Sequence, residues 1–312
     1  MDLGVQIEPQ FGFSYESVRD IARAASIAGF TRLWVSDHLF LNKESVATDC
    51  LEAWTLLAAL ARDTERIRIG PMVTAQSYRN PALLAKIAAG VDQMSGGRLE
   101  FGLGAGWKDV EYKAYGYEFP EAGLRVTQLV ETLEICTRLW RDERATYQGR
   151  YYRIDEAVCA PKPKQQPLPI WIGGTKPRVM RVAAKWAQWF NMSNPSTPAA
   201  ERITTMNASL AEACKAVGRD RSTLKTSLFV VAYVAETRGE LDTLLDELAT
   251  KARMPRAEWL ASRPGAIVGT PDEAALKFRE IARAGIDHAN VMLPHGHELD
   301  GVKALTQIAQ DR

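Results

Sequence analysis

The sequence repeats one pattern eight times along its length: a short apolar run rich in strand-forming residues, followed by a longer amphipathic segment. Such alternation predicts parallel strands that are buried on both faces and covered by helices. The predicted strands are 3–8, 32–37, 67–75, 98–106, 169–174, 188–193, 226–235 and 288–294.

Three of the intervening segments carry recognisable helix boundaries. Each begins at a Ser, Asn or Thr that can cap free backbone N–H groups, and each ends at glycine, which tolerates the left-handed conformation that closes a helix. Two of them also have proline at the first helical position. The predicted helices are 14–29 with cap Ser14, 80–97 with cap Asn80, and 270–285 with cap Thr270.

Eight strand–helix units favour a closed (β/α)₈ TIM barrel over an open doubly wound sheet, since such barrels take roughly 250 residues. The chain has 312 residues, and the excess falls after the fourth and seventh predicted strands. We therefore predict one α/β domain over 1–312 with insertions at about 107–167 and 236–270. The first insertion is expected to hold one helix, 123–142, and a Pro/Gln-rich stretch, and the second a long helical connection.

The composition narrows the classes of partner. Apolar residues make up 46% and charged residues 25% of the chain, and the formal net charge is +1. This balance argues against nucleic acid or a membrane as partner and leaves a small-molecule substrate. The four cysteines are scattered, without metal-binding or disulfide-rich spacing, and the N-terminus has no signal-peptide pattern. We predict a cytoplasmic protein.

The stretch LWVSDHL (33–39) ends a buried strand with Asp37 and His38. Active sites of (β/α)₈ barrels lie where the strands end at their carboxyl face. Asp37 and His38 are thus a candidate catalytic acid–base unit, in which His38 donates a proton near neutral pH and Asp37 fixes its surroundings. The alternative is a helix-capping Asp beside a structural His.

Two glycine-rich turns follow later strands. GLGAGW (102–107) places glycine at alternate positions, where backbone can approach a ligand closely or simply turn. Gly173, Gly174 and Thr175 precede a helix that begins near Pro177, which is the arrangement of an anion site, with Lys176 or Arg178 nearby to add charge. The alternative is a turn and helix cap without a ligand.

HGHE (295–298) offers the His-x-His spacing of some metal sites, but no further ligands are apparent, so loop polarity or a pocket wall is favoured and no metal is predicted. Cys50, near the start of a helix, is read as a packing residue and not a nucleophile.

Several segments together resemble the bacterial-luciferase-like superfamily, in its branch of oxidoreductases that depend on coenzyme F420, an 8-hydroxy-5-deazaflavin. The resemblance covers nearly the whole chain. It implies a (β/α)₈ barrel with an insertion after the fourth strand, a homodimer, and a bound flavin or deazaflavin. The matching segments are 33–39, 79–86, 95–120, 139–152 and 167–178.

The resemblance also implies roles for particular residues. Asp37 and His38 match the pair that faces the deazaflavin ring, with His38 as proton donor or acceptor. GPMVT (70–74) matches a bulged strand with a cis peptide between Met72 and Val73 that supports the ring. The other cofactor-binding residues implied are Thr74, the loop Gly104, Ala105, Gly106 and Trp107, and the phosphate turn Gly173, Gly174 and Thr175.

The sequence thus predicts a hydride transfer between F420 and a small organic substrate. A sugar-phosphate dehydrogenase of the same branch carries Glu where Trp107 stands, which argues against a sugar phosphate here. The alternatives are an FMN-dependent monooxygenase of the same superfamily, a non-catalytic flavin-binding barrel and, more distantly, a metal-dependent hydrolase. Substrate identity and the direction of hydride transfer stay open.

Overall fold

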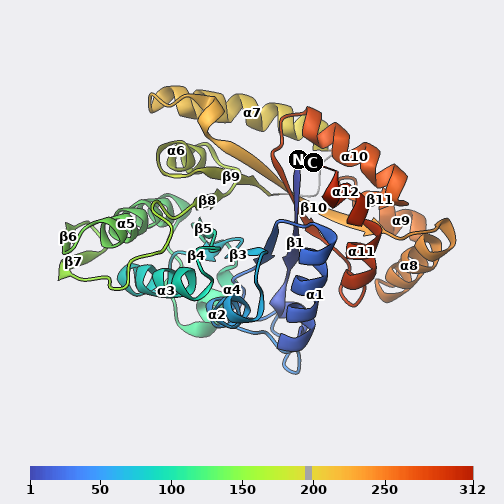
Figure 1. Cartoon of the computed structure of the whole chain (residues 1–312), viewed down its shortest axis with the longest axis horizontal. Helices are drawn as coiled ribbons and strands as arrows, with labels where there is room; N and C mark the ends of the chain where they lie inside the picture. Colours follow the sequence, from blue (N-terminus) through green and yellow to red (C-terminus); the bar gives the residue numbers. More distant parts are fainter. Residues whose placement is uncertain (194–198, 312) are drawn as a thin grey trace.

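The computed structural model describes residues 1–193 and 199–311 and shows a barrel of parallel strands surrounded by helices (Figure 1). Strands pair in the order β3-β2-β1-β12-β10-β9-β8-β5-β4, all in parallel. Ile69 in β3 and Leu99 before β5 form a further parallel bridge, which closes the ring. The barrel strands are β1 (Asp2–Ile7), β2 (Arg32–Val35), β3 (Arg68–Pro71), β4 (Thr74–Ala75), β5 (Phe101–Gly104), β8 (Ile170–Gly173), β9 (Trp189–Met192), β10 (Lys225–Val234) and β12 (His288–Met292).

The predicted (β/α)₈ fold is confirmed, and each predicted strand has its counterpart. The third one differs in detail, because the segment predicted at 67–75 is divided into β3 and β4 around a cis peptide between Met72 and Val73. Side chains such as Val5, Leu33 and Val291 are fully buried, as expected where both faces of a parallel sheet are covered.

The helices form the outer layer. Asn80 accepts hydrogen bonds from the N–H groups of Ala82 and Leu83, and Ser14 accepts one from Ser17, as two of the three predicted caps require. The third, Thr270, stands at the N-cap of α10 (Pro271–Arg283), where its own N–H is accepted by Glu273. The helices outside the two insertions are α1 (Tyr15–Ala28), α2 (Ala53–Asp63), α3 (Pro81–Met94), α6 (Pro177–Trp186), α7 (Ala199–Ala216), α10 (Pro271–Arg283), α11 (Glu298–Ala304) and α12 (Thr306–Gln310), with 3₁₀ turns at Pro9–Phe11 and Arg221–Thr223.

The insertion after β5 contains more structure than one helix. Besides α5 (Ala122–Arg141) it holds α4 (Asp109–Tyr115) and an antiparallel hairpin of β6 (Ala145–Gln148) and β7 (Arg153–Ala157). The sequence prediction missed the last three, since they are short. The buried carboxylate of Glu131 on α5 fixes the hairpin by accepting the N–H groups of residues 150–152.

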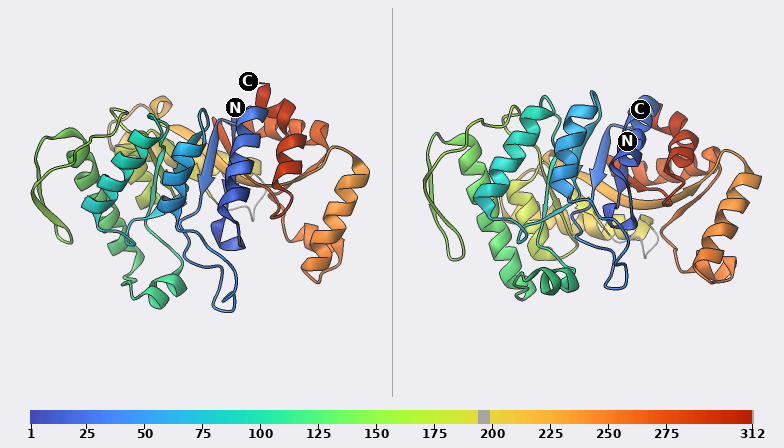
Figure 2. Two further views of the ribbon diagram at one scale, coloured as in Figure 1. Left: turned by 60° about the horizontal axis from the view of Figure 1, so that its bottom comes forward. Right: turned by 90° about the horizontal axis from the view of Figure 1, so that it is seen from below.

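The insertion after β10 also differs from a purely helical connection. It contains α8 (Arg238–Lys251), α9 (Arg256–Ala261) and the short strand β11 (Ile267–Gly269), which extends the sheet by pairing in parallel with the end of β10. The hairpin and the α8–α9 unit project at opposite ends of the long axis, and the chain termini lie close together (Figures 1 and 2). No helix of the described residues is long and apolar enough to cross a membrane.

The amino-terminal end of the barrel is filled by an aromatic plug, which comprises Trp34, Trp171, Trp189 and His288. Trp171 and Trp189 stack with ring centroids 4.2 Å apart, and Trp34 meets Trp171 edge-on at 4.6 Å. These four side chains are at most 7% exposed, so they fill this end of the barrel.

Candidate functional site

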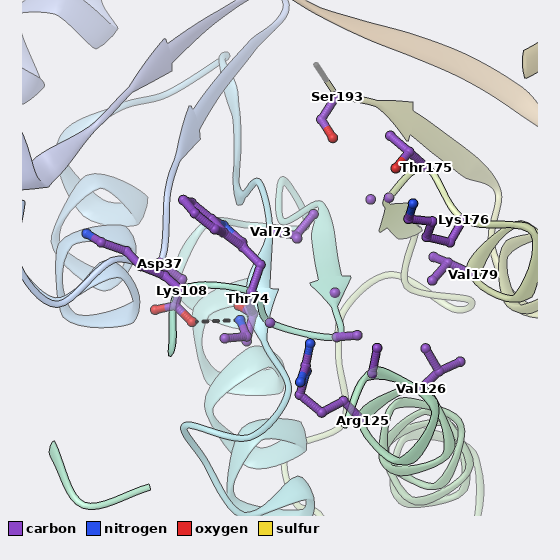
Figure 3. A pocket seen from close by; sticks show the side chains of 18 of the residues that line it. Asp37, Val73, Thr74, Lys108, Arg125, Val126, Thr175, Lys176, Val179 and Ser193 are labelled. Carbon is purple, nitrogen blue, oxygen red and sulfur yellow. Dashed lines mark hydrogen bonds between the residues drawn. The ribbon is translucent and has the colours of Figure 1, made fainter. Parts of the chain in front are cut away.

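A cavity of about 580 Å³ lies at the carboxyl ends of the barrel strands, and α4, α5 and the start of α6 complete its wall (Figure 3). This volume is in the range of small-molecule and cofactor sites. The structure brings all twelve predicted site residues to this one cavity. They are Asp37, His38, Met72, Val73, Thr74, Gly104, Ala105, Gly106, Trp107, Gly173, Gly174 and Thr175.

The cavity floor is formed at the break between β3 and β4. The Met72–Val73 peptide there is cis, as the sequence predicted. A Cβ atom at Gly104 would lie 2.6 Å from Val73 Cγ2, and one at Gly173 would lie 3.1 Å from Val73 Cγ1. The two glycines therefore make room for the Val73 side chain, in addition to any approach of a ligand that the sequence suggested.

The carboxylate of Asp37 is bound by other residues of the protein. Its side chain is 2% exposed, and both oxygens bind the Arg79 guanidinium at 2.7 and 2.9 Å. One oxygen also accepts the N–H of Ala75 at 3.0 Å. Arg79 in turn pairs with Glu52. The carboxylate thus ties the end of β2 to β4 and to the loop that precedes α3, and so fixes the cavity floor.

His38 is held by a carboxylate that the sequence prediction missed. Its Nδ1 lies 3.0 Å from Glu111 Oε2, on α4. The imidazole lines the cavity, and its Nε2 has no hydrogen-bond partner in the described part of the chain. A carboxylate at Nδ1 favours the tautomer with the proton on Nδ1, which leaves Nε2 as the atom that can exchange a proton with a ligand.

Glu111 is fully buried and ionised. It accepts further hydrogen bonds from Leu39 N–H at 2.9 Å, Tyr78 O–H at 2.8 Å and Lys108 Nζ at 3.0 Å. Burial alone raises the pKa of this carboxyl, but His38, the Leu39 N–H and Lys108 outweigh burial and lower the pKa from 4.5 to about 2. A permanent negative charge therefore stands behind His38 at neutral pH.

The thiol of Cys50 donates a hydrogen bond to the carbonyl of His38 at 3.3 Å. Burial raises the pKa of this thiol to about 11, so it remains protonated and acts as a packing residue.

The opposite side of the cavity has the character of an anion site. Gly174 has φ +154°, and the turn leads into α6 with Thr175 and Lys176 exposed at its start. Arg125 of α5 contributes a guanidinium whose Nε is buried without a partner among the described residues. An orphaned buried donor and a cationic rim fit the phosphorylated tail of a flavin-type cofactor.

The HGHE segment does not join this cavity. His295 pairs with Glu298, and His297 with Glu247. Within 1–193 and 199–311, no group of three or more His, Cys, Asp or Glu side chains is placed to hold a metal ion.

The site residues that the sequence did not single out are Arg79, Lys108, Glu111 and Arg125. Three of them lie in the motif-bearing segments 79–86 and 95–120, so the segments were recognised although these side chains were not. Nothing in a local pattern shows that a glutamate on α4 reaches a histidine 73 positions earlier in the chain.

The chain belongs to the luciferase-like monooxygenase family, whose model matches residues 1–288. The predicted family and its oxidoreductase class are thereby confirmed.

Among curated relatives, an F420-dependent glucose-6-phosphate dehydrogenase of Nakamurella multipartita is 31% identical over 325 residues, covering 95% of this chain and 91% of that protein. The corresponding enzyme of Microbacterium testaceum is 32% identical over 189 residues, which is 60% of this chain and only 55% of that protein. A solved F420-dependent secondary alcohol dehydrogenase in complex with an F420–acetone adduct superimposes with TM-score 0.82 over 98% of this chain and 97% of its own, at 19% identity. This last likeness supports the fold.

Proposed function

We propose that this chain transfers a hydride between coenzyme F420 and a small organic substrate, with His38 as proton donor or acceptor. The observation that carries the proposal is the pair of His38 and Glu111, in which a buried ionised carboxylate holds Nδ1 and leaves Nε2 to the cavity. The names of the curated relatives support F420 as the cofactor.

The bound deazaflavin would accept or supply the hydride. The chain's own residues do the remaining work. His38 Nε2 takes the substrate proton during oxidation and returns it during reduction, and the Glu111 carboxylate stabilises the imidazolium that forms. Asp37 keeps the floor in place through Ala75 N–H, which makes it a residue that shapes the cofactor site.

The phosphate-bearing tail is proposed to lie against Gly173, Gly174 and Thr175. Thr175 and Lys176 are exposed there at the start of α6, where backbone N–H groups and the helix dipole favour an anion. Met72, Val73 and Thr74 would lie under the ring, and residues 104–107 beside it.

A binding titration of the purified chain with F420, FMN and NADPH tests the cofactor. We expect F420 to bind most tightly. Tighter binding of FMN would favour the FMN-dependent monooxygenase, the second candidate, which the name of the family keeps open.

Gly174→Asp tests the position of the tail, because it adds bulk and negative charge. A Cβ there would lie 2.8 Å from Val179 Cγ1, so folding is checked by circular dichroism, and exposed Lys176→Glu serves as a second variant. F420 affinity should fall at least about tenfold, or 1.4 kcal/mol, in Gly174→Asp. Gly239→Asp on α8, where a Cβ has open space, is the matched control. Unchanged affinity in both folded variants would place the tail elsewhere.

Three further features are proposed from the sequence and the family resemblance: a single domain, a homodimer and a cytoplasmic location. Sedimentation of the purified chain tests the dimer, and limited proteolysis the single domain.

A further inference from the structure

Trp107 is the most exposed aromatic side chain beside His38. The indole is 72% exposed although it lines the cavity, and it meets the His38 ring edge-on with centroids 5.6 Å apart. Gly106 before it has φ +77°, and a Cβ there would lie 1.8 Å from the hydroxyl of Tyr112. The turn is therefore specific to glycine, and it holds the indole at the cavity mouth next to the proposed proton carrier.

At the His38 end of the cavity, the ammonium group of Lys108 already makes three hydrogen bonds. Lys108 Nζ donates to the carbonyls of Phe40 and Leu41 at 2.6 and 2.8 Å and to Glu111 at 3.0 Å. An ammonium group has three donors, so none remains for a ligand. Arg79 is likewise occupied by Asp37 and Glu52.

Among the described residues, the other cations of the cavity wall are Arg125 on α5, Lys176 just before α6 and Arg178 on α6. Figure 3 shows Asp37 and Lys108 on one side of the cavity, and Thr175 and Lys176 on the other. Arg125 is stacked over Phe119 at 3.9 Å and also donates to the carbonyl of Pro120. A phosphate group at the His38 end would thus lose water without gaining a free cation, which is costly. The exposed indole offers apolar contact instead.

We propose that the substrate of this site is an uncharged alcohol or its carbonyl counterpart with an apolar or aromatic body, bound against the Trp107 indole with its oxygen at His38 Nε2. This inference rests on the proposed function. It separates this chain from its relatives named for glucose 6-phosphate.

The reaction balances without another reactant. In the oxidation, the carbinol carbon loses a hydride to F420, the O–H bond breaks, its proton passes to His38 Nε2, and the C–O bond becomes a carbonyl. The reduction runs through the same atoms in reverse, with reduced F420 as the hydride source.

The test uses the F420-loaded chain with three probes: 1-phenylethanol, acetophenone with reduced F420, and glucose 6-phosphate. We expect kcat/KM for 1-phenylethanol or acetophenone to exceed that for glucose 6-phosphate by at least about tenfold. Trp107→Ala should raise KM for the aromatic probe by up to about tenfold, because stacking is lost, and Trp107→Phe should retain most of the affinity. Leu276→Ala on α10 removes another exposed apolar side chain and serves as the control. It should change neither KM nor kcat/KM for the aromatic probe.

The outcomes separate the two proposals. A chain that fails to bind F420 in the titration contradicts the proposed function, and this inference with it. A loaded chain that prefers glucose 6-phosphate, or that turns over neither neutral probe, overturns the substrate class alone. An unchanged KM in folded Trp107→Ala would overturn the role of the indole.

Discussion

The two ends of the barrel use the same kinds of side chain for opposite purposes. At the carboxyl end, His38 and Glu111 border an open cavity; at the amino end, His288 and Glu100 lie among the tryptophans of the aromatic plug. In (β/α)₈ barrels the first face carries function and the second stability. The contrast shows that access, more than residue type, decides what a buried acid–imidazole group can do.

The two histidines differ in their partners. His38 has a carboxylate at Nδ1 and a ring edge toward the cavity. His288 is fully buried, accepts the Trp34 Nε1–H at 3.1 Å on Nε2, and its Nδ1 has no partner in the described residues. Burial, followed by the charge of Arg32, lowers the pKa of His288 well below 6.5. It is therefore a neutral packing group.

The two glutamates differ in what their charge supports. Glu111 accepts from His38, Lys108 and backbone, and so orients a ring that a ligand can reach. Glu100 is 2% exposed and binds Arg32 at 3.1 Å, Arg68 at 2.5 Å and Trp171 Nε1 at 2.6 Å. This network joins β2, β3, β5 and β8 at the closed end.

The largest effect that should separate the two ends is on turnover. His38→Ala should reduce kcat by about 10²–10⁴, or roughly 3–5 kcal/mol of barrier, because a positioned acid–base group is lost. F420 should still bind, since its proposed phosphate contacts remain. His288→Gln should keep kcat per folded molecule. Parallel kcat and F420 titrations on both variants make the comparison. Turnover of His38→Ala at the parental rate would mean that water or another residue supplies the proton.

The second effect is on stability at neutral pH. Glu100→Gln removes the buried carboxylate that Arg32 and Arg68 share and leaves Arg32 only its longer contact with Asp2 at 3.5 Å, so the free energy of unfolding should fall by about 3–5 kcal/mol. Glu134→Gln, which removes a partly exposed i,i+4 pair with Arg138, should cost less than about 1 kcal/mol. Urea unfolding measures both. If the free energy of unfolding falls no more in Glu100→Gln than in Glu134→Gln, the Glu100 network does not contribute to stability as proposed.

Most of the fold was predictable because it depends on local signals. Apolar runs located all the barrel strands, with β3 and β4 predicted as one, and Asn80 with Pro81 marked the start of α3. The short elements α4, β6, β7 and β11 were missed, since they have only three to seven residues and so carry little periodicity.

The candidate site was predictable only where its residues stand in motifs. Asp37 and His38 follow a strand end, and the glycine turns follow two others, so topology alone gathers them at one face. Glu111 and Arg79 complete the site through contacts 73 and 42 positions apart, which no single stretch reveals. The closed end was missed for the same reason, because Glu100 and Arg32 become partners only when the barrel closes.

The third effect is the loss of stability in acid that Glu111 causes at the open end of the barrel. The pKa of Glu111 is about 2 in the folded chain and near 4.5 when unfolded. A lowered folded pKa adds stability that is fully present above pH 4.5 and is lost as the pH falls toward 2, at most about 3 kcal/mol. Urea unfolding of the wild type and Glu111→Gln should therefore differ most near neutral pH and converge in acid. A pH-independent difference would show that Glu111 acts through packing alone.

The smallest effect lies between pH 7.5 and 5.5 and belongs to the closed end. Because the folded pKa of His288 is far below the unfolded value of 6.5, only the unfolded chain takes up a proton as the pH falls through this range. Its contribution to stability is complete above pH 6.5 and declines below it, by at most about 1.4 kcal/mol per pH unit. Glu111 stays ionised throughout this range, so it adds nothing to the slope. As the pH falls through this range, the free energy of unfolding of His288→Gln should accordingly decline less steeply than that of the wild type. Equal slopes in wild type and His288→Gln would mean that the folded chain protonates His288, and that water reaches the end of the barrel that the tryptophans fill.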